Sequence, residues 1–345
     1  FTPLHGTTYE LVPASLRNWG FTNIHTVPEQ SIPDGDFPTV ASANPEEPAA
    51  FKMALDLARK IDADLAMACD PDGDRIGIAV KNDAGEWTLL NGNQTNIIFT
   101  EYIIRRKKEL NQLKGGEYTV KTIVTTELMK DIAEKNHIIC YDVYTGFKWI
   151  ADIIRKEGGE KFIGGGEESF GYMPGAFTRD KDGVSATSLM AEIAAWVKMQ
   201  NKTLYSFLKE IYAKYGFSQE RMIYIVRKGL SGAQEIKAMM EEFRHNTPKE
   251  INHSPVVLKK DYLSLEATNL QTGEKTHLDF ETKSDVLQFF LADGSKISVR
   301  PSGTEPKIKF YFEARTQMKD INDYERAQQE ANARIDAIIK DLKLQ

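Results

Sequence analysis

Strand-like and helix-like segments alternate over the first two thirds of this 345-residue chain, and this alternation constrains the fold most strongly. The expected helices include 8–19, 49–61, 93–109, 127–136 and 149–157, and the expected strands include 23–27, 63–69, 120–125, 138–143 and 161–164. A lysine- and glycine-rich segment, 111–117, interrupts the pattern, which then restarts. Alternation of this kind is typical of helices that cover a parallel or mixed sheet. The sequence therefore predicts two tandem α/β domains, residues 1–113 and 114–216.

The pattern changes from about residue 218 onward. Several short strands separated by turns follow one another, and a charged amphipathic helix is expected over 321–342. We therefore expect a third domain, residues 217–345, of α+β class with a mainly antiparallel sheet.

The composition is that of an ordinary globular protein, with 41% hydrophobic and 27% charged residues. A net charge of −6 gives no general attraction to nucleic acid or to anionic membranes, so neither is an expected partner. No apolar run reaches the roughly 18 residues of a membrane span, and no signal peptide is visible. Cys69 and Cys140 lie in apolar segments and are expected to be free thiols, which favours a cytoplasmic location.

The hexapeptide Asp-Pro-Asp-Gly-Asp-Arg at residues 70–75, hereafter the metal loop, places three carboxylates at alternate positions. Like charges this close repel one another unless a cation lies among them. Oxygen ligands suit Mg²⁺ or Ca²⁺ better than zinc or copper. Arg75 adds a guanidinium that could bind a phosphate. The loop follows a buried strand, and the carboxyl ends of strands are where open α/β sheets bind ligands.

Two alternatives bear on the metal loop. An acidic turn in water remains open, although the flanking segments are strand-like. An EF-hand loop requires Gly at its sixth position and Glu at its twelfth, and counting from Asp70 those positions hold Arg75 and Lys81. The sequence therefore argues against an EF-hand.

Two further loops contain groups that could bind a sugar phosphate. The segment Gly164–Gly171, hereafter the glycine-rich loop, offers Glu167 and Ser169 to sugar hydroxyls, and its glycines allow a ligand to approach the backbone. It leads to Arg179 and Lys181, which could bind an anion. A flexible turn followed by a solvated charged loop is the alternative.

The segments Tyr144–Lys148 and Arg300–Pro306 also come where strands are expected to end. The second, hereafter the phosphate loop, combines a guanidinium, two hydroxyls and backbone N–H groups around a glycine, which suits a phosphate. Lys309 could add another cation. A plain helix entry and a plain hairpin are the alternatives.

In this order, these loops resemble those of the α-D-phosphohexomutase superfamily, in particular its phosphoglucomutase/phosphomannomutase group. The motifs that carry the resemblance are Thr2–Thr7, Asp70–Arg75, Thr145–Lys148, Gly166–Gly171 and Arg300–Thr304. Members of this family move phosphate between the 1- and 6-positions of a hexose through a bisphosphorylated sugar and a phosphoserine. The resemblance implies an α/β fold: two tandem mixed or parallel-sheet α/β domains of phosphohexomutase type and a C-terminal α+β domain like the TATA-binding protein.

The same resemblance implies the cofactors and the site. Mg²⁺ is expected on Asp70, Asp72 and Asp74, and hexose 1,6-bisphosphate is expected as intermediate and activator. Catalytic roles are implied for Arg75 and Lys181. Substrate-binding roles are implied for Thr145, Gly146, Lys148, Glu167, Ser169, Arg179, Arg300, Ser302, Gly303, Thr304 and Lys309. The expected partners are small-molecule sugar phosphates, and the sequence indicates no oligomeric state.

One family motif has no counterpart. The nucleophile sequence, approximately Thr-Ala-Ser-His-Asn-Pro, is absent: Ser42–Pro45 imitates it without the histidine, and His245–Pro248 lacks a preceding serine. The resemblance therefore extends to family domains 2 to 4, and we expect a fragment without the N-terminal phosphoserine domain. Such a fragment should bind Mg²⁺ and sugar phosphate without turnover, because loss of a nucleophile can cost on the order of 10⁶ in rate. A phosphopentomutase of the same family and a non-catalytic sugar-phosphate-binding protein are the alternatives.

Overall fold

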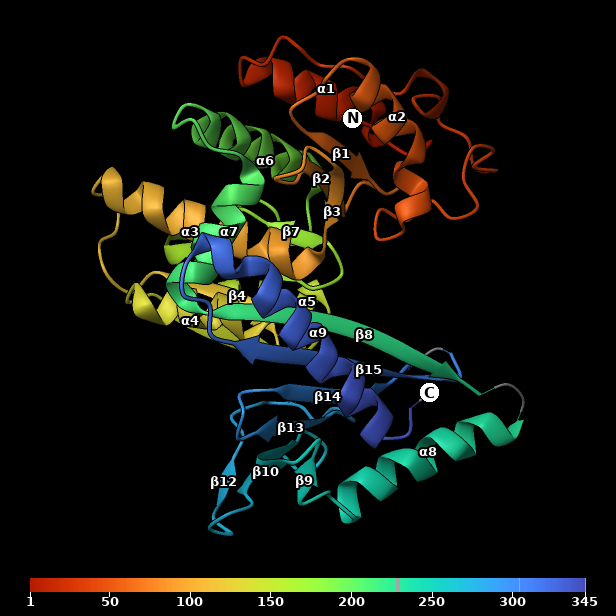
Figure 1. Ribbon diagram of the computed structural model, residues 1–345, viewed down its shortest axis with the longest axis vertical. Coiled ribbons are helices and arrows are strands. Elements are labelled where there is room, and N and C mark those ends of the chain that lie inside the picture. Colours follow the sequence, from red (N-terminus) through yellow and green to blue (C-terminus); the bar gives the residue numbers. More distant parts are fainter. Residues whose placement is uncertain (228–229, 304, 345) are drawn as a thin grey trace. The chain divides into compact units, whose positions relative to one another are not determined.

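The computed structural model describes residues 1–227, 230–303 and 305–344, and the chain divides into two compact units, Phe1–Tyr215 and Gly216–Gln345 (Figure 1). The division of the first unit near residue 113 stays a prediction. No helix among the described residues is long and apolar enough to span a bilayer.

The first unit begins with a small antiparallel sheet. Its strands are β1 (Ala66–Cys69), β2 (Ile76–Lys81) and β3 (Trp87–Leu90), in the order β1-β2-β3. An isolated parallel bridge joins Thr2 to Ala68 on the other side of β1. Helices α1 (Thr8–Asn18) and α2 (Lys52–Lys60) belong to this part, where the buried side chains of Leu4 and Phe51 pack with the alanines of β1 and β2. The metal loop is the connection between β1 and β2.

The second sheet of this unit is mixed. Its strands are β4 (Tyr118–Thr122), β5 (Ile139–Val143), β6 (Phe162–Glu167) and β7 (Gly171–Met173), in the order β5-β4-β6-β7. β4 runs parallel to β5 and β6, and β7 runs antiparallel to β6. The remaining helices of the unit are α3 (Gly92–Glu109), α4 (Glu127–Lys135), α5 (Phe147–Glu157), α6 (Gly183–Lys198) and α7 (Leu204–Tyr215). The glycine-rich loop is formed by β6, β7 and the turn between them.

Two expectations for the first 80 residues differ from the structure. Residues 23–27 do not form a strand. Their backbone makes two hydrogen bonds with Phe1: the Phe1 amino group donates to the His25 carbonyl, and the Val27 N–H donates to the Phe1 carbonyl. Among the described residues this pairing extends no further. The apolar run before the metal loop is a buried strand, as expected, but its ladder is antiparallel to β2. Its parallel pairing is limited to Thr2, so the helix–strand alternation here does not produce a fully parallel sheet.

The second unit is built on one antiparallel sheet with the order β12-β11-β10-β13-β14-β15-β8. The short strand β9 lies outside this order and pairs with the first residues of β10. Its strands are β8 (Phe217–Val226), β9 (Glu250–Ile251), β10 (Ser254–Asp261), β11 (Glu266–Asn269), β12 (Lys275–His277), β13 (Leu287–Leu291), β14 (Lys296–Pro301) and β15 (Lys307–Thr316). Helices α8 (Leu230–His245) and α9 (Tyr324–Asp341) complete it. The predicted change to an α+β arrangement is confirmed, and the phosphate loop is the turn between β14 and β15.

Candidate metal and sugar-phosphate site

The backbone of the metal loop is fixed from both sides. Gly73 adopts a φ of +76°, a left-handed conformation that glycine allows, and its N–H donates to the Asp70 carbonyl at 3.0 Å. The Thr7 N–H donates to the Pro71 carbonyl at 2.8 Å, and the Gly183 N–H donates to the Gly73 carbonyl at 3.0 Å. The loop is therefore held between the segment before α1 and the first residue of α6.

This backbone brings the three carboxylates together. One oxygen from each of Asp70, Asp72 and Asp74 lies within 4.8 Å of the other two. Asp70 is buried, Asp74 is half-buried and Asp72 is exposed. Burial, followed by the charges of Asp74 and Asp72, raises the pKa of Asp70 to about 7, although the Arg75 N–H that donates to it opposes this shift. The cluster thus carries an electrostatic cost that a cation would relieve.

An oxygen without a hydrogen bond supports a cation site at this cluster. Asp74 Oδ1 is buried and accepts no hydrogen bond from any described residue, and its ion-pair contact with Arg75 Nε is long, at 3.7 Å. A buried carboxylate oxygen without a hydrogen bond is costly, and oxygen ligands of this kind suit a hard divalent cation. The residues present therefore fit a divalent ion such as Mg²⁺.

Two cationic side chains border the three carboxylates. Lys181 Nζ lies 2.6 Å from Asp74 Oδ2. Burial opposes its charge, but the contacts with Asp74 and Asp180 raise the pKa of Lys181 above its ordinary value. Arg75 Nε lies 3.5 Å from Asp70 Oδ2 and 3.7 Å from Asp74 Oδ1. Both side chains carry cationic groups that could bind a phosphate near a metal ion.

The glycine-rich loop is joined directly to the metal loop. Arg75 and Gly171 form an antiparallel bridge, and the Ile76 N–H donates to the Phe170 carbonyl at 3.0 Å. Glu167, at the end of β6, is buried and accepts the Gly146 N–H at 2.5 Å. The structure therefore brings together three loops that are far apart in the sequence: 70–75, 144–148 and 164–171.

Glu167 lies in an environment unusual for a carboxylate. Burial, followed by the charge of neighbouring Glu168, raises the pKa of Glu167 to about 7, despite the Gly146 N–H and the nearby cations. A carboxyl group with this pKa can either donate or accept a hydrogen bond near neutral pH. Ser169 lies in the turn that follows, between β6 and β7.

Two candidate cations of the first unit point to other contacts. Lys148 is exposed, and its Nζ lies 5.0 Å from the centre of the Trp149 ring. Arg179 is exposed, and its Nη1 donates to the carbonyls of Thr178, at 2.9 Å, and Ala176. The Lys148 contact lies within α5 and the Arg179 contacts lie within its own loop, so no hydrogen bond or ion pair among the described residues joins either side chain to the metal loop.

The candidate residues of the second unit gather at the β14–β15 turn. Arg300 and Lys309 are direct cross-strand partners, which places both cations on the same face of the sheet. The Ser302 N–H donates to the Lys307 carbonyl at 2.8 Å, and the Glu305 N–H donates to Ser302 Oγ at 3.3 Å. Gly303 follows Ser302 in the turn, and the predicted contact residue Thr304 lies outside the described residues.

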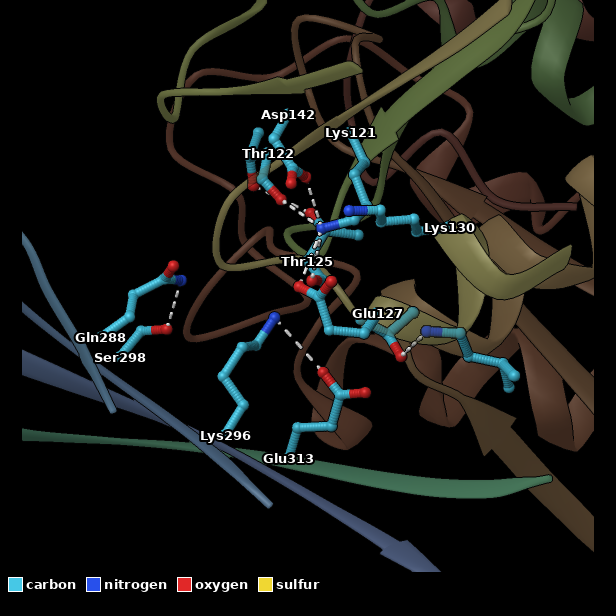
Figure 2. Close-up of polar contacts among 12 residues, drawn as sticks. Lys121, Thr122, Thr125, Glu127, Lys130, Asp142, Gln288, Lys296, Ser298 and Glu313 are labelled. Carbon is cyan, nitrogen blue, oxygen red and sulfur yellow. Dashed lines mark hydrogen bonds and ion pairs between the residues drawn. The ribbon is translucent and has the colours of Figure 1, made fainter. Parts of the chain in front are cut away.

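A buried ion cluster beside the glycine-rich loop was not anticipated from the sequence. Lys121 of β4 forms ion pairs with Asp142 and Glu127 (Figure 2), and its Nζ lies 2.7 Å from Asp142 Oδ1 and 3.1 Å from Glu127 Oε1. Burial opposes its charge, but these carboxylates raise the pKa of Lys121 well above its ordinary value. The hydroxyls of Thr122 and Thr125, beside this cluster, each donate to Glu168 at 3.2 Å. The one available signal in the sequence is a lysine inside a strand-like segment rich in threonine, valine and isoleucine.

A polar row of the second unit is also drawn in Figure 2. Gln288 Nε2 donates to Ser298 Oγ at 2.8 Å, and Lys296 Nζ lies 3.3 Å from Glu313 Oε2. Lys296, Ser298 and Arg300 alternate along β14, so they share one face of the sheet.

Solved phosphohexomutase structures share this fold. A putative phosphomannomutase from Thermus thermophilus aligns with 99% of this chain and 59% of its own, with a TM-score of 0.62 and 19% identity. The phosphoglucomutase parafusin from Paramecium, in an open form, aligns with 100% of this chain and 56% of its own, with a TM-score of 0.65 and 18% identity. The protein is therefore of the phosphohexomutase fold class.

Three family models of phosphoglucomutase/phosphomannomutase match the chain in sequence. Alpha/beta/alpha domain II matches residues 1–85, alpha/beta/alpha domain III matches residues 91–215, and the C-terminal domain matches residues 235–336. A phosphoglucomutase from Staphylococcus aureus (strain MRSA252) is 38% identical over 312 residues, which cover 90% of this chain and 55% of that relative. The chain belongs to the phosphoglucomutase/phosphomannomutase family, and it spans about half the length of the curated relatives that it matches.

Proposed function

We propose that this chain supplies the metal-, sugar- and phosphate-binding parts of a mutase that interconverts hexose 1-phosphate and hexose 6-phosphate. The observation that carries the proposal is the bridge between Arg75 and Gly171, which joins the three-carboxylate loop to the glycine-rich loop. The family relationship supports the reaction class, and the relative from Staphylococcus aureus, named a phosphoglucomutase, favours glucose phosphates.

In this proposal, the residues of the first unit bind the reacting end of the sugar phosphate. Asp70, Asp72 and Asp74 hold Mg²⁺, which when bound neutralises charge on the phosphoryl group that is transferred. Arg75 and Lys181 bind the same phosphoryl group as fixed cations. They stabilise the negative charge of this group while the bond between its phosphorus and the departing oxygen breaks.

Sugar recognition is assigned to the loops beside the metal loop. Glu167 and Ser169 bind sugar hydroxyls, with Glu167 held in place by the Gly146 N–H. Thr145, Gly146, Lys148 and Arg179 complete this group; Lys148 and Arg179 must leave their present contacts to reach a ligand.

The non-reacting phosphate is assigned to the second unit. Arg300, Ser302, Gly303 and Thr304 bind it through the guanidinium, the hydroxyls and the backbone, and Lys309 adds charge from the strand opposite Arg300. Hexose 1,6-bisphosphate, the proposed intermediate, carries two phosphates and so requires phosphate-binding groups of both kinds.

The phosphoryl donor is proposed to be a phosphoserine from outside residues 1–345, in the same polypeptide or another. Residues 1–345 alone are then expected to bind ligands without turnover. The setting is proposed to be the cytoplasm, in keeping with the free thiols of Cys69 and Cys140.

Calorimetric titration of glucose 1,6-bisphosphate into the polypeptide of residues 1–345, with Mg²⁺ present, tests the proposal. We expect binding that is lost when Glu167 is replaced by Ala, and no conversion of glucose 1-phosphate in a coupled assay. If the polypeptide binds none of glucose 1-phosphate, mannose 1-phosphate and ribose 1-phosphate, the mutase assignment is contradicted. Tighter binding of ribose 1-phosphate would instead favour a phosphopentomutase.

A further inference from the structure

The backbone of Arg75 is fixed on several sides, whereas its side chain is long and has several rotatable bonds. The Arg75 N–H donates to Asp70 Oδ1 at 2.9 Å, and the residue forms a bridge with Gly171. A Cβ on Gly183 would lie 3.0 Å from the Arg75 carbonyl, so the first residue of α6 also packs against this backbone. What remains to be set is the direction of the guanidinium.

One carboxylate outside the metal loop makes the shortest ion pair of that guanidinium. Glu46 Oε1 accepts from Arg75 Nη1 at 2.8 Å, whereas Asp70 and Asp74 lie 3.5 and 3.7 Å from Nε. A guanidinium is a rigid plane of donors, so fixing one nitrogen sets the direction of the others.

Glu46 is presented by an ordered turn. The side chain of Asn44 accepts the Glu46 N–H at 3.1 Å, and the Asn44 carbonyl accepts the Glu47 N–H at 3.0 Å. Pro45 is buried, and a Cβ on Gly77 of β2 would lie 2.8 Å from it, so the turn packs directly on the strand that follows the metal loop. The contact with Arg75 is thus made from a fixed position.

We propose that Glu46 is a positioning residue that holds the Arg75 guanidinium beside the metal carboxylates without letting it form a bidentate hydrogen-bonded pair with either of them. The inference rests on the proposed role of Arg75 in binding the transferred phosphate. A bidentate pair with a carboxylate is a favoured contact of arginine, and two metal carboxylates lie within 4 Å of Nε. Without Glu46, the guanidinium turns onto Asp70 or Asp74 and competes with the cation for the same oxygens.

Mn²⁺ titration of residues 1–345 tests this competition without any need for turnover. Glu46→Gln should weaken Mn²⁺ binding about tenfold, within the range found when groups that orient metal ligands are removed. Glu46→Asp keeps the charge but is one methylene shorter, so it should weaken binding as much as Glu46→Gln does. Glu47→Gln, a change at the exposed neighbouring residue, is the matched control and should stay within about twofold of the wild type.

A double-mutant cycle separates positioning from simple charge. In an Arg75→Met background, adding Glu46→Gln should change Mn²⁺ affinity by less than about twofold, because no guanidinium remains to be positioned. Wild-type affinity in Glu46→Asp, or a full additional loss in the double variant, would overturn the proposal.

An NMR measurement gives a readout that does not depend on the metal. In protein labelled at arginine, the Nε and Nη signals of Arg75 should shift in both Glu46 variants relative to the wild type, because the guanidinium exchanges Glu46 for Asp70 or Asp74 as its partner. Unchanged signals in both variants would overturn the proposal. If the wild type binds no Mn²⁺ but these signals respond as expected, the metal assignment fails while the positioning role of Glu46 stands.

Discussion

The metal loop and the phosphate loop differ in how closely the surrounding protein packs on them. A Cβ on Gly6 would lie 2.3 Å from Pro71 Cα, and one on Gly183 would lie 2.6 Å from the Gly73 carbonyl oxygen. At Gly303 of the phosphate loop, a Cβ would meet no described atom within 4 Å. The metal loop is therefore enclosed by protein backbone, and the phosphate loop leaves room beside its glycine.

This difference matches the two functions proposed for these loops, a cation site in the first unit and a phosphate site in the second. Three carboxylates can be held within a few ångströms of one another only if the fold opposes their repulsion, which requires a rigid frame. A phosphate site needs hydrogen-bond donors that an anion can reach whichever way the anion is oriented. A turn with open space around its glycine leaves its donors accessible in this way. The first unit is therefore expected to be sensitive to packing changes, and the second to changes in its donors.

The largest expected effect on stability comes from adding one methyl group at a glycine that packs on the metal loop, compared with the same change at the glycine of the phosphate loop. Gly6→Ala should destabilise the first unit by about 3 kcal/mol, because the added Cβ meets backbone that cannot move aside without shifting the metal loop. Gly303→Ala should change stability by less than about 0.5 kcal/mol. Urea unfolding of both variants measures the difference, and equal destabilisation would show that the metal loop is not rigidly enclosed.

The next effect concerns pH and Glu167, whose pKa is raised to about 7 from an ordinary value of 4.5. Between these pH values the folded protein keeps a proton that the unfolded chain has lost. The contribution of Glu167 to the free energy of unfolding is therefore complete below about pH 4.5, and it is lost as the pH rises toward 7. Glu167→Gln keeps a neutral side chain at every pH and removes this dependence.

Thermal or urea unfolding across this pH range checks that sign. At pH 8, Glu167→Gln should be more stable than the wild type by roughly 1–3 kcal/mol, and near pH 4.5 the two should be nearly equal. Because Asp70 contributes to both proteins alike, the difference between the curves isolates Glu167. A wild type that gains stability relative to the variant as pH rises would contradict the assignment.

The smallest effect is expected from exchanging one cation for another in the second unit. Arg300→Lys should leave stability almost unchanged but weaken glucose 1,6-bisphosphate binding about tenfold, because an ammonium cannot bind phosphate through two parallel hydrogen bonds. Arg326→Lys is the control, since that guanidinium pairs with Asp323 and Glu330 of the same unit. Equal affinities in the Arg300 variant and the wild type would remove Arg300 from the phosphate site.

The sequence predicted those parts of the site that depend on local chemistry. The alternating aspartates after an apolar run indicated a carboxylate cluster at the end of a buried strand, and the structure confirms that placement. The family resemblance is confirmed by three domain models. The ligand roles of the individual side chains stay predictions.

Features that depend on long-range contacts could not be derived in the same way. Residues 23–27 have the composition of a strand, but strand formation needs a neighbour of matching length, and Phe1 supplies only two hydrogen bonds. The pairing of Glu46 with Arg75 joins residues 29 positions apart, and no local pattern shows which of two adjacent glutamates faces the metal loop. Lys121 similarly finds Asp142 only because β4 and β5 run side by side.

The central claim is that the metal loop binds a cation. The most direct test is a calorimetric titration of Mn²⁺ into the polypeptide of residues 1–345 and into its Asp72→Asn variant. Asp72 is exposed, so its replacement should cost little stability, and Asp64→Asn, which changes another exposed aspartate, is the matched control. We expect one cation per chain, an affinity weakened about 100-fold or more in Asp72→Asn, and an unchanged affinity in Asp64→Asn. Equal affinities in the wild type and Asp72→Asn would contradict the account.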